Sequence, residues 1–310
     1  MSRVNKSELY LKTTVVGSFP CQPSREMMIR SYFDHSDPFL NSIKQSIEKQ
    51  IDAKIDIISD GQTRGGMVES FASKIPGFRM KKKPVIVSEL YYEDAITLPD
   101  ILYALQFVDT TQIKGILTGP YTLRRFSIND YYKTDQEAAF AIAEILNKEA
   151  RILQGHVAII QVDEPFFSVE YPEYAAELID TVFKNISIPR ALHVCGRVEK
   201  IFPKLIEFDI DILDHEFAQN PELLDYISEY DFSQMIGYGC VRNDIENVET
   251  WEEIYITLKK ASELLDYKNL IIDPDCGLRH LTQKTAYLKL KNMVKARDKL
   301  IQYLEREGIA

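Results

Sequence analysis

A regular alternation of short apolar runs with longer amphipathic stretches constrains the fold of this chain more than any other feature. Eight runs rich in Val, Ile and Leu lie at residues 13–19, 55–61, 113–120, 157–165, 189–196, 209–217, 234–240 and 269–277. Between them lie stretches with apolar residues three or four positions apart, among them 37–54, 135–155 and 248–266. This pattern is typical of parallel strands buried on both faces by amphipathic helices.

Eight such repeats in 310 residues predict an α/β fold of the (β/α)8 TIM-barrel type rather than an open doubly wound sheet. The repeat is interrupted at 76–98, where the apolar run "PVIVSEL" precedes a helix expected at about 98–109. We interpret residues 76–98 as a hairpin-like insertion in a βα loop. No Gly/Ser-rich linker or internal repeat divides the chain, so we expect a single catalytic barrel domain over residues 1–310.

Charge and composition exclude several classes of partner. The net charge is −10, and the one dense basic cluster, "RMKKKP" at 79–84, is short. Nucleic acid is therefore not the expected ligand, and we interpret the cluster as a solvated loop. No apolar run approaches the roughly 20 residues that span a bilayer, so we expect no membrane partner. The cysteines lie far apart and the first 14 residues lack an apolar signal segment, which favours a cytoplasmic protein without disulfides.

The unusual polar residues of the chain gather at the ends of the predicted strands. In a TIM barrel these ends converge on one mouth, where binding and catalytic groups lie. Three of the four cysteines and two of the five histidines join carboxylates there, and the set is Asp60, Asp163, Glu164, His193, Cys195, His215, Glu216, Cys240, Asp275 and Cys276. We therefore expect a mouth that combines thiols, imidazole and carboxylates.

Four of these residues form a candidate zinc site. His193 and Cys195 have the same parity on one strand, and Glu216 and Cys276 end two others. Zinc in proteins takes roughly four ligands from Cys, His and Asp or Glu, so we predict one Zn²⁺ per chain. Three anionic ligands would leave a further bound thiolate nucleophilic, which favours alkylation of sulfur over hydrolysis.

Other interpretations of these residues stay open. Each part of the set, taken alone, is more typical of a packed core, and only the joint occurrence at three strand ends favours a metal. Cys240 is a rival for one ligand position, and Cys21 is more remote.

Ordered motifs through most of the chain carry a family resemblance. They are "TTVVGSFP" (13–20), "IISDGQTRGGMVESF" (57–71), "GILTGPYTL" (115–123), "IIQVDEP" (159–165), "LHVCG" (192–196), "LDHEF" (213–217), "IGYGCV" (236–241) and "DPDCGL" (273–278). With these motifs the chain resembles the catalytic barrel of the cobalamin-independent methionine synthase family, in a short form without the extra N-terminal barrel of the long enzymes. The resemblance implies a methyltransferase that makes L-methionine from L-homocysteine, with zinc held by His193, Cys195, Glu216 and Cys276.

The resemblance also implies where the amino acid head group binds. Gly17, Ser18 and Asp163 match family positions that hold it. Gln62 stands where the long enzymes have Glu, so Asp60 is an alternative partner for the substrate ammonium. Gly66 stands where the family usually has Asp.

The expected methyl donor follows from a departure from the family pattern. The loop after the seventh strand contains Asp244 and no histidine, whereas the long enzymes have there a histidine proposed to handle protons near a folate. A methylated corrinoid leaves without needing a proton. We therefore predict a protein-bound methyl-corrinoid as donor, with Asp244 as the one candidate catalytic residue outside the zinc site.

Two alternative functions remain. The first is a related zinc methyltransferase acting on another thiol such as coenzyme M, whose sulfonate would prefer a basic partner such as Arg64 or Arg124. The second is a non-catalytic protein that binds zinc or thiols.

Overall fold

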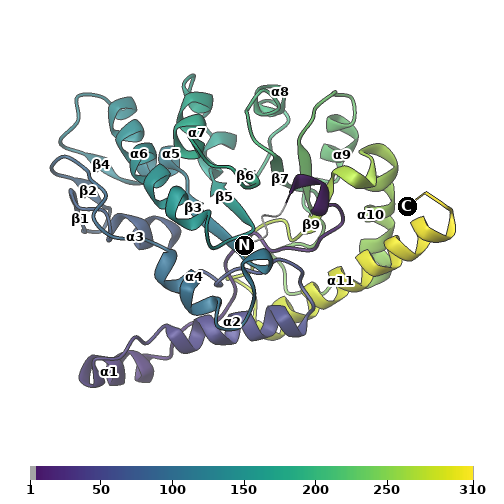
Figure 1. Cartoon of the computed structure of the whole chain (residues 1–310), viewed down its shortest axis with the longest axis horizontal. Helices are drawn as coiled ribbons and strands as arrows, with labels where there is room; N and C mark the ends of the chain where they lie inside the picture. Colours follow the sequence, from purple (N-terminus) through teal and green to yellow (C-terminus); the bar gives the residue numbers. More distant parts are fainter. Residues whose placement is uncertain (1–4, 310) are drawn as a thin grey trace.

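The computed structural model describes residues 5–309, so the ends of the predicted domain, 1–4 and 310, lie outside it. Within this range six parallel strands form one sheet in the order β3-β5-β6-β7-β8-β9. Their bounds are β3 Lys114–Thr118, β5 Ile159–Asp163, β6 Arg190–His193, β7 Ile212–Glu216, β8 Met235–Gly239 and β9 Leu270–Asp273. They lie at the centre of the molecule (Figure 1).

Single parallel bridges close this sheet into a barrel. They pair Thr13 with Ile272, Thr14 with Ile57 and Ile58 with Ile113. The segments at 13–14 and 57–58 thus occupy the places of the first two predicted strands, and the (β/α)8 prediction is confirmed. Both segments are shorter than predicted, in part because the Thr13 N–H donates to the Asp56 carboxylate at 2.8 Å rather than to a neighbouring strand.

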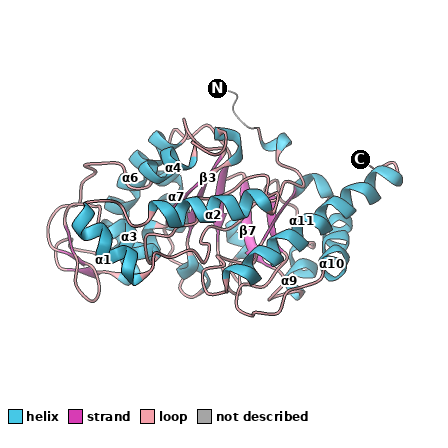
Figure 2. Cartoon of the chain, turned by 90° about the horizontal axis from the view of Figure 1, so that it is seen from below, coloured by secondary structure: helices cyan, strands magenta, loops and turns pink. Residues whose placement is uncertain are grey.

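Helices surround the strands (Figures 1 and 2). They are α2 Leu40–Asp52, α3 Met67–Ala72, α4 Leu98–Ala104, α5 Pro120–Phe126, α6 Asp135–Leu153, α7 Ala175–Phe183, α8 Phe202–Leu205, α9 Glu222–Ile227, α10 Trp251–Leu264 and α11 Gln283–Arg306. The helix α1 (Arg25–Asp34) extends away from the barrel, and Ser31 is its one buried residue. Among residues 5–309, no helix has the length and apolar character needed to span a bilayer.

The expected insertion at 76–98 is present. Strands β1 (Phe78–Arg79) and β2 (Val85–Ile86) pair antiparallel, and β4 (Ile128–Asn129) adds to β2 in parallel. The basic residues 81–83 between β1 and β2 are exposed, so the basic cluster is a solvated loop, as predicted.

The barrel interior is built in layers. An apolar layer consists of Leu9, Ile57, Ala158, Ile159, Ala191, Ile212, Met235 and Ile271. Because side chains alternate along a strand, the residues two positions further on face the same interior, and there the strands carry Gln161, His193, Asp214, Gly237 and Asp273. The four side chains at these positions are polar and at most 2% exposed. A buried polar layer therefore lies between the apolar layer and the barrel mouth.

Candidate active site

Three of the four predicted zinc ligands converge at the barrel mouth. His193 ends β6, Cys195 follows it by two residues, and Cys276 follows β9. One ligand atom from each lies within 4.8 Å of the other two. Both ring nitrogens of His193 are buried, and among the described residues Nε2 has no hydrogen-bond partner. An unsatisfied imidazole beside two thiols is a donor set that zinc prefers, so these residues fit the predicted metal.

The fourth predicted ligand, Glu216, lies outside this group. It ends β7, is 6% exposed, and accepts a hydrogen bond from the Gly196 N–H at 2.8 Å through Oε2. Burial raises the pKa of its carboxyl group. Glu216 is thus placed at the neighbouring strand end and held by the backbone that follows Cys195.

The other two cysteines are buried away from the three-residue group. The Cys240 thiol lies 3.4 Å from the Asp273 carbonyl oxygen, and burial raises its pKa well above the usual range. Cys21 is fully buried in the apolar core. These environments are typical of packed thiols rather than metal ligands.

A carboxylate lies behind the imidazole. His193 Nδ1 and Asp214 Oδ1 are 3.2 Å apart, and both side chains are about 2% exposed. A carboxylate on one ring nitrogen fixes the imidazole orientation and leaves the other nitrogen for a metal. The position of Asp214 therefore favours Nε2 as the ligand atom of His193.

The metal-binding group opens into a pocket of about 430 Å³, hereafter the mouth pocket. Six predicted site residues line it, namely Ser18, Gln62, Asp163, His193, Cys195 and Cys276. It is also lined by residues that the sequence did not single out as ligand-binding, namely Val16, Met67, Pro165, Asn243, Gly277, Arg279 and His280, together with Gly66. The mouth pocket thus brings Ser18 and Asp163 together with the His193, Cys195 and Cys276 group.

Two glycines let polar side chains reach this pocket. A Cβ atom at Gly17 would lie 2.5 Å from Gln62 Oε1, so the Gln62 amide rests against the Gly17 backbone. A Cβ atom at Gly277 would collide with the Ser18 hydroxyl, which lies directly over Gly277. Both glycines provide the close approach that places Gln62 and Ser18 at the mouth.

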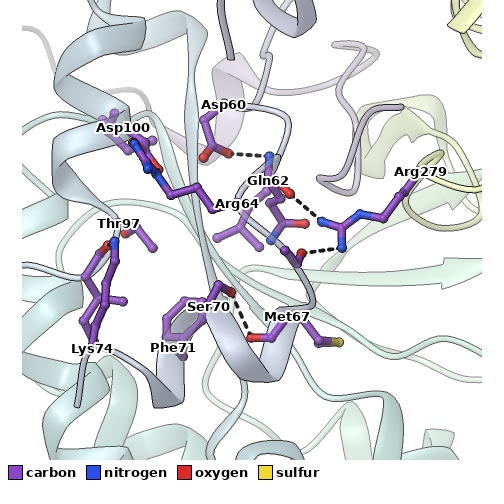
Figure 3. A pocket seen from close by; sticks show the side chains of 14 residues that line it. Asp60, Gln62, Arg64, Met67, Ser70, Phe71, Lys74, Thr97, Asp100 and Arg279 are labelled. Carbon is purple, nitrogen blue, oxygen red and sulfur yellow. Dashed lines mark hydrogen bonds and ion pairs between the residues drawn. The ribbon is translucent and has the colours of Figure 1, made fainter. Parts of the chain in front are cut away.

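The loop that carries Gln62 turns through a left-handed backbone, with φ of +83° at Gly61 and +45° at Gln62. The Arg279 guanidinium holds this loop by donating to the carbonyl oxygens of Gln62 and Gly65 (Figure 3). Arg279 thereby links the loop after β9 to the loop after the second barrel segment.

Asp60 faces a different cavity. It lines a small pocket with Arg64, Lys74 and Asp100 (Figure 3), and its Oδ1 accepts a hydrogen bond from the Gln62 N–H at 3.1 Å. Burial, followed by the nearby Asp100 charge, raises the pKa of Asp60 to about 6. Asp60 thus lines the small pocket, whereas Gln62 lines both this pocket and the mouth pocket. A role of Asp60 toward the substrate ammonium stays a prediction.

Asp163 supplies a buried carboxylate to the mouth pocket. It ends β5, is 7% exposed, and accepts a hydrogen bond from Gln161 Nε2 at 2.7 Å. Burial raises its pKa to about 6, while His193 opposes this shift. Asp163 is placed to accept hydrogen bonds from a bound ammonium group.

Asp244, the candidate for proton handling, points elsewhere. It pairs with Arg242 at 2.7 Å on the surface, which lowers its pKa to about 2. His280, four residues after Cys276, lines the mouth pocket instead. This imidazole comes from the loop after the last strand, and no motif in the sequence signals that the loop reaches the mouth.

The two arginines considered as sulfonate partners are already paired. Arg64 binds Asp100 and Asp37, each at 2.5 Å. Arg124 pairs with Asp135 and donates to the Ser127 carbonyl oxygen. These pairings do not favour a sulfonate thiol as the acceptor.

Comparison with known proteins gives consistent matches along the whole chain. Residues 11–299 match the family described as "Cobalamin-independent synthase, Catalytic domain". The methionine synthase of Methanocaldococcus jannaschii is 37% identical over 311 residues, covering 94% of this chain and 99% of the relative. That of Saccharolobus solfataricus is 29% identical, with 96% and 97% covered.

Solved structures of other proteins have the same fold. The B12-independent methionine synthase of Shewanella sp. W3-18-1, in complex with selenomethionine, superimposes with a TM-score of 0.83 at 25% identity, covering 96% of this chain and 99% of that one. A methyltransferase from Methanosarcina mazei shares the fold, with a TM-score of 0.66 at 15% identity and 94% of each chain covered.

Proposed function

Because the chain belongs to the cobalamin-independent methionine synthase family, a family of methyltransferases, we propose that it methylates the sulfur of L-homocysteine in a zinc-dependent reaction. The observation that carries this proposal is the mouth pocket. It is lined both by the His193, Cys195 and Cys276 group and by the buried carboxylate of Asp163. One pocket thus combines a thiol-binding metal site with a partner for an amino group.

Different residues of the mouth pocket bind the thiol, the ammonium group and the carboxylate of the acceptor. Zinc held by His193, Cys195 and Cys276 would lower the pKa of the acceptor thiol so that the thiolate is present near neutral pH. Asp163 accepts hydrogen bonds from the ammonium group, and the Ser18 hydroxyl with the backbone at Gly17 orients the carboxylate. Glu216, at the neighbouring strand end, would supply the fourth zinc ligand when no acceptor thiol is bound.

A bound product analogue in a relative supports this assignment. The Shewanella protein was solved in complex with selenomethionine, which differs from methionine by one atom. A relative that binds an analogue of methionine supports methionine as the product proposed here.

The corrinoid donor predicted from the sequence has no support from the comparisons, because the matching family is described as cobalamin-independent. The corrinoid was predicted because the loop after the seventh strand contains no histidine. The structure places another imidazole, that of His280, at the mouth pocket. We therefore propose the acceptor and the metal but no single methyl donor, and the experiment compares two donors.

The test measures methionine formed by the zinc-loaded protein from L-homocysteine. Methylcobalamin and methyltetrahydrofolate are supplied in parallel as donors, and coenzyme M serves as the competing acceptor. We expect methylation of homocysteine over coenzyme M, and loss of activity when zinc is removed by a chelator and its return on readdition. Preference for coenzyme M would contradict the acceptor assignment. Zinc and homocysteine binding without turnover from either donor would favour the binding-only alternative.

A further inference from the structure

A buried lysine lies in the polar layer beneath the mouth pocket. Lys114 is the first residue of β3 and is 2% exposed. Burial lowers its pKa, while the charges of Asp214, Asp273 and Asp163 act in the opposite direction. A buried ammonium group requires both charge compensation and hydrogen-bond acceptors. The residues that pair with Lys114 therefore indicate its role.

The hydrogen bond from Lys114 fixes the orientation of a neighbouring amide. Lys114 Nζ donates to Gln161 Oε1 at 2.5 Å. A lysine ammonium has three donors and no acceptor, so the Gln161 oxygen must face it. The Gln161 NH2 group is thereby directed to the opposite side.

That NH2 group reaches the amino acid side of the site. Gln161 Nε2 donates to the Val16 carbonyl oxygen at 2.9 Å and to Asp163 Oδ1 at 2.7 Å. Both N–H bonds of the amide are then used, and Asp163 Oδ1 is held as an acceptor. The second carboxylate oxygen of Asp163 is left for a ligand in the mouth pocket, which Val16 and Asp163 both line.

We propose that Lys114 is a positioning residue that acts through Gln161 to hold Asp163 in the orientation that recognises the amino group of the acceptor. This inference rests on the proposed function, since it presumes an acceptor with an ammonium group. Without Lys114 the Gln161 oxygen loses its donor, and the amide is oriented by the Val16 carbonyl oxygen alone. An amide turned by the loss of this donor would direct its oxygen at the Asp163 carboxylate. The resulting repulsion would displace Asp163 while leaving the thiol side of the pocket in place.

The experiment compares two acceptors that differ only in the amino group, L-homocysteine and 4-mercaptobutanoate. Their binding to the zinc-loaded full chain is measured by calorimetry for wild type and Lys114→Met, and zinc content is measured separately. We expect Lys114→Met to lose about tenfold to a hundredfold in homocysteine affinity, the range for a hydrogen bond to a charged group. The affinity for 4-mercaptobutanoate should change less than threefold, roughly the scatter between independent sites.

A matched control is available in Lys289, a second buried lysine. It lies on α11, is fully buried, and pairs with Glu249 at 2.7 Å outside the mouth pocket. Lys289→Met removes a buried ammonium group with similar consequences for stability. It should leave the ratio of the two affinities unchanged.

Two further variants keep the inference falsifiable. Gln161→Met breaks the same connection and should give the same selective loss, which decides the matter if Lys114→Met does not fold. In the Asp163→Asn background, Lys114→Met should have little further effect on homocysteine affinity, because the two residues act on one contact. An unchanged affinity ratio in Lys114→Met and Gln161→Met, or an equal loss toward both acceptors, would overturn the inference. If wild type itself does not prefer homocysteine over 4-mercaptobutanoate, the proposed function fails first.

Discussion

Gly237 and Asp214 face each other across β7 and β8 so closely that position 237 has no room for a side chain. The two residues are register partners, and a Cβ atom at 237 would lie 2.8 Å from the Asp214 Cβ and 3.0 Å from its Cα. The space left by Gly237 lets the Asp214 carboxylate lie 3.2 Å from His193 Nδ1 on the next strand. The orientation of a predicted metal ligand therefore depends on a glycine two strands away.

Asp214→Asn should weaken zinc binding by about 10- to 100-fold, the usual effect of losing a carboxylate that orients a ligating histidine. Gly237→Ala should act in the same direction, because its Cβ would displace Asp214. Competition with a chelator of known affinity measures both. Asp209→Asn is the matched control, since Asp209 is exposed and pairs with Arg190. Zinc affinity equal to that of wild type in Asp214→Asn would contradict this role.

Cys195→Ser and Cys276→Ser should each lose most of the zinc, because each change removes a soft, anionic ligand. The barrel should remain folded, since a core of this size does not depend on a metal. Metal analysis gives the zinc content and circular dichroism the fold. Cys240→Ser should keep its zinc, as its thiol faces the Asp273 carbonyl oxygen. Full zinc occupancy in both of the first two variants would refute the site.

Glu216→Gln should weaken zinc binding less than either cysteine variant. The structure holds the Glu216 carboxylate on the Gly196 N–H, outside the group of three converging ligand atoms. An amide at this position keeps a neutral oxygen for the metal and loses one charge. Chelator competition ranks the three variants, and a loss as large as that of Cys276→Ser would show that Glu216 is an equal ligand.

Asp163→Asn should lower homocysteine affinity by about 1.5–3 kcal/mol, the range for a hydrogen bond to a charged group. The side chain keeps its shape and loses the charge that we propose faces the substrate ammonium. Zinc content should not change, because Asp163 does not belong to the group of three converging ligand atoms. Calorimetric titration with L-homocysteine measures the effect, and an unaltered affinity would argue against this role.

Residues at strand ends were predictable from the sequence because one rule places them. Continuous apolar runs identify parallel strands, and the ends of parallel strands in a barrel converge. The rule selected His193, Cys195 and Cys276, whose ligand atoms the structure brings within 4.8 Å of one another, and Asp163, which lines the same pocket. The same rule also selected Cys240, whose side chain the structure buries away from the mouth.

Residues whose role depends on loop direction or on other side chains could not be predicted. Asp60 ends a segment as Asp163 does, but its side chain lines an adjoining pocket. His280 reaches the mouth pocket from a loop, and loop paths are not encoded in strand periodicity. Lys114 is the first residue of a strand, and the rule identifies only residues at the carboxyl ends of strands.

Asp60 also gives a prediction for stability. Burial, together with the Asp100 charge, raises the pKa of Asp60 to about 6 in the folded protein, whereas an aspartate in an unfolded chain has a pKa of about 3.9. The folded state therefore binds this proton more tightly, and the free energy of unfolding falls as pH rises between these two values. Above about pH 6 this contribution is constant.

Asp60→Asn removes the titration while keeping an oxygen that can accept from the Gln62 N–H. Between about pH 4 and pH 7, wild type should therefore lose on the order of 2 kcal/mol of stability relative to Asp60→Asn. Urea unfolding of both proteins at several pH values in this range measures the difference. Asp94→Asn, at an exposed position, controls for the loss of one negative charge. A difference between wild type and Asp60→Asn that stays constant across the range would show that the folded protein does not hold the Asp60 proton more tightly than the unfolded chain does.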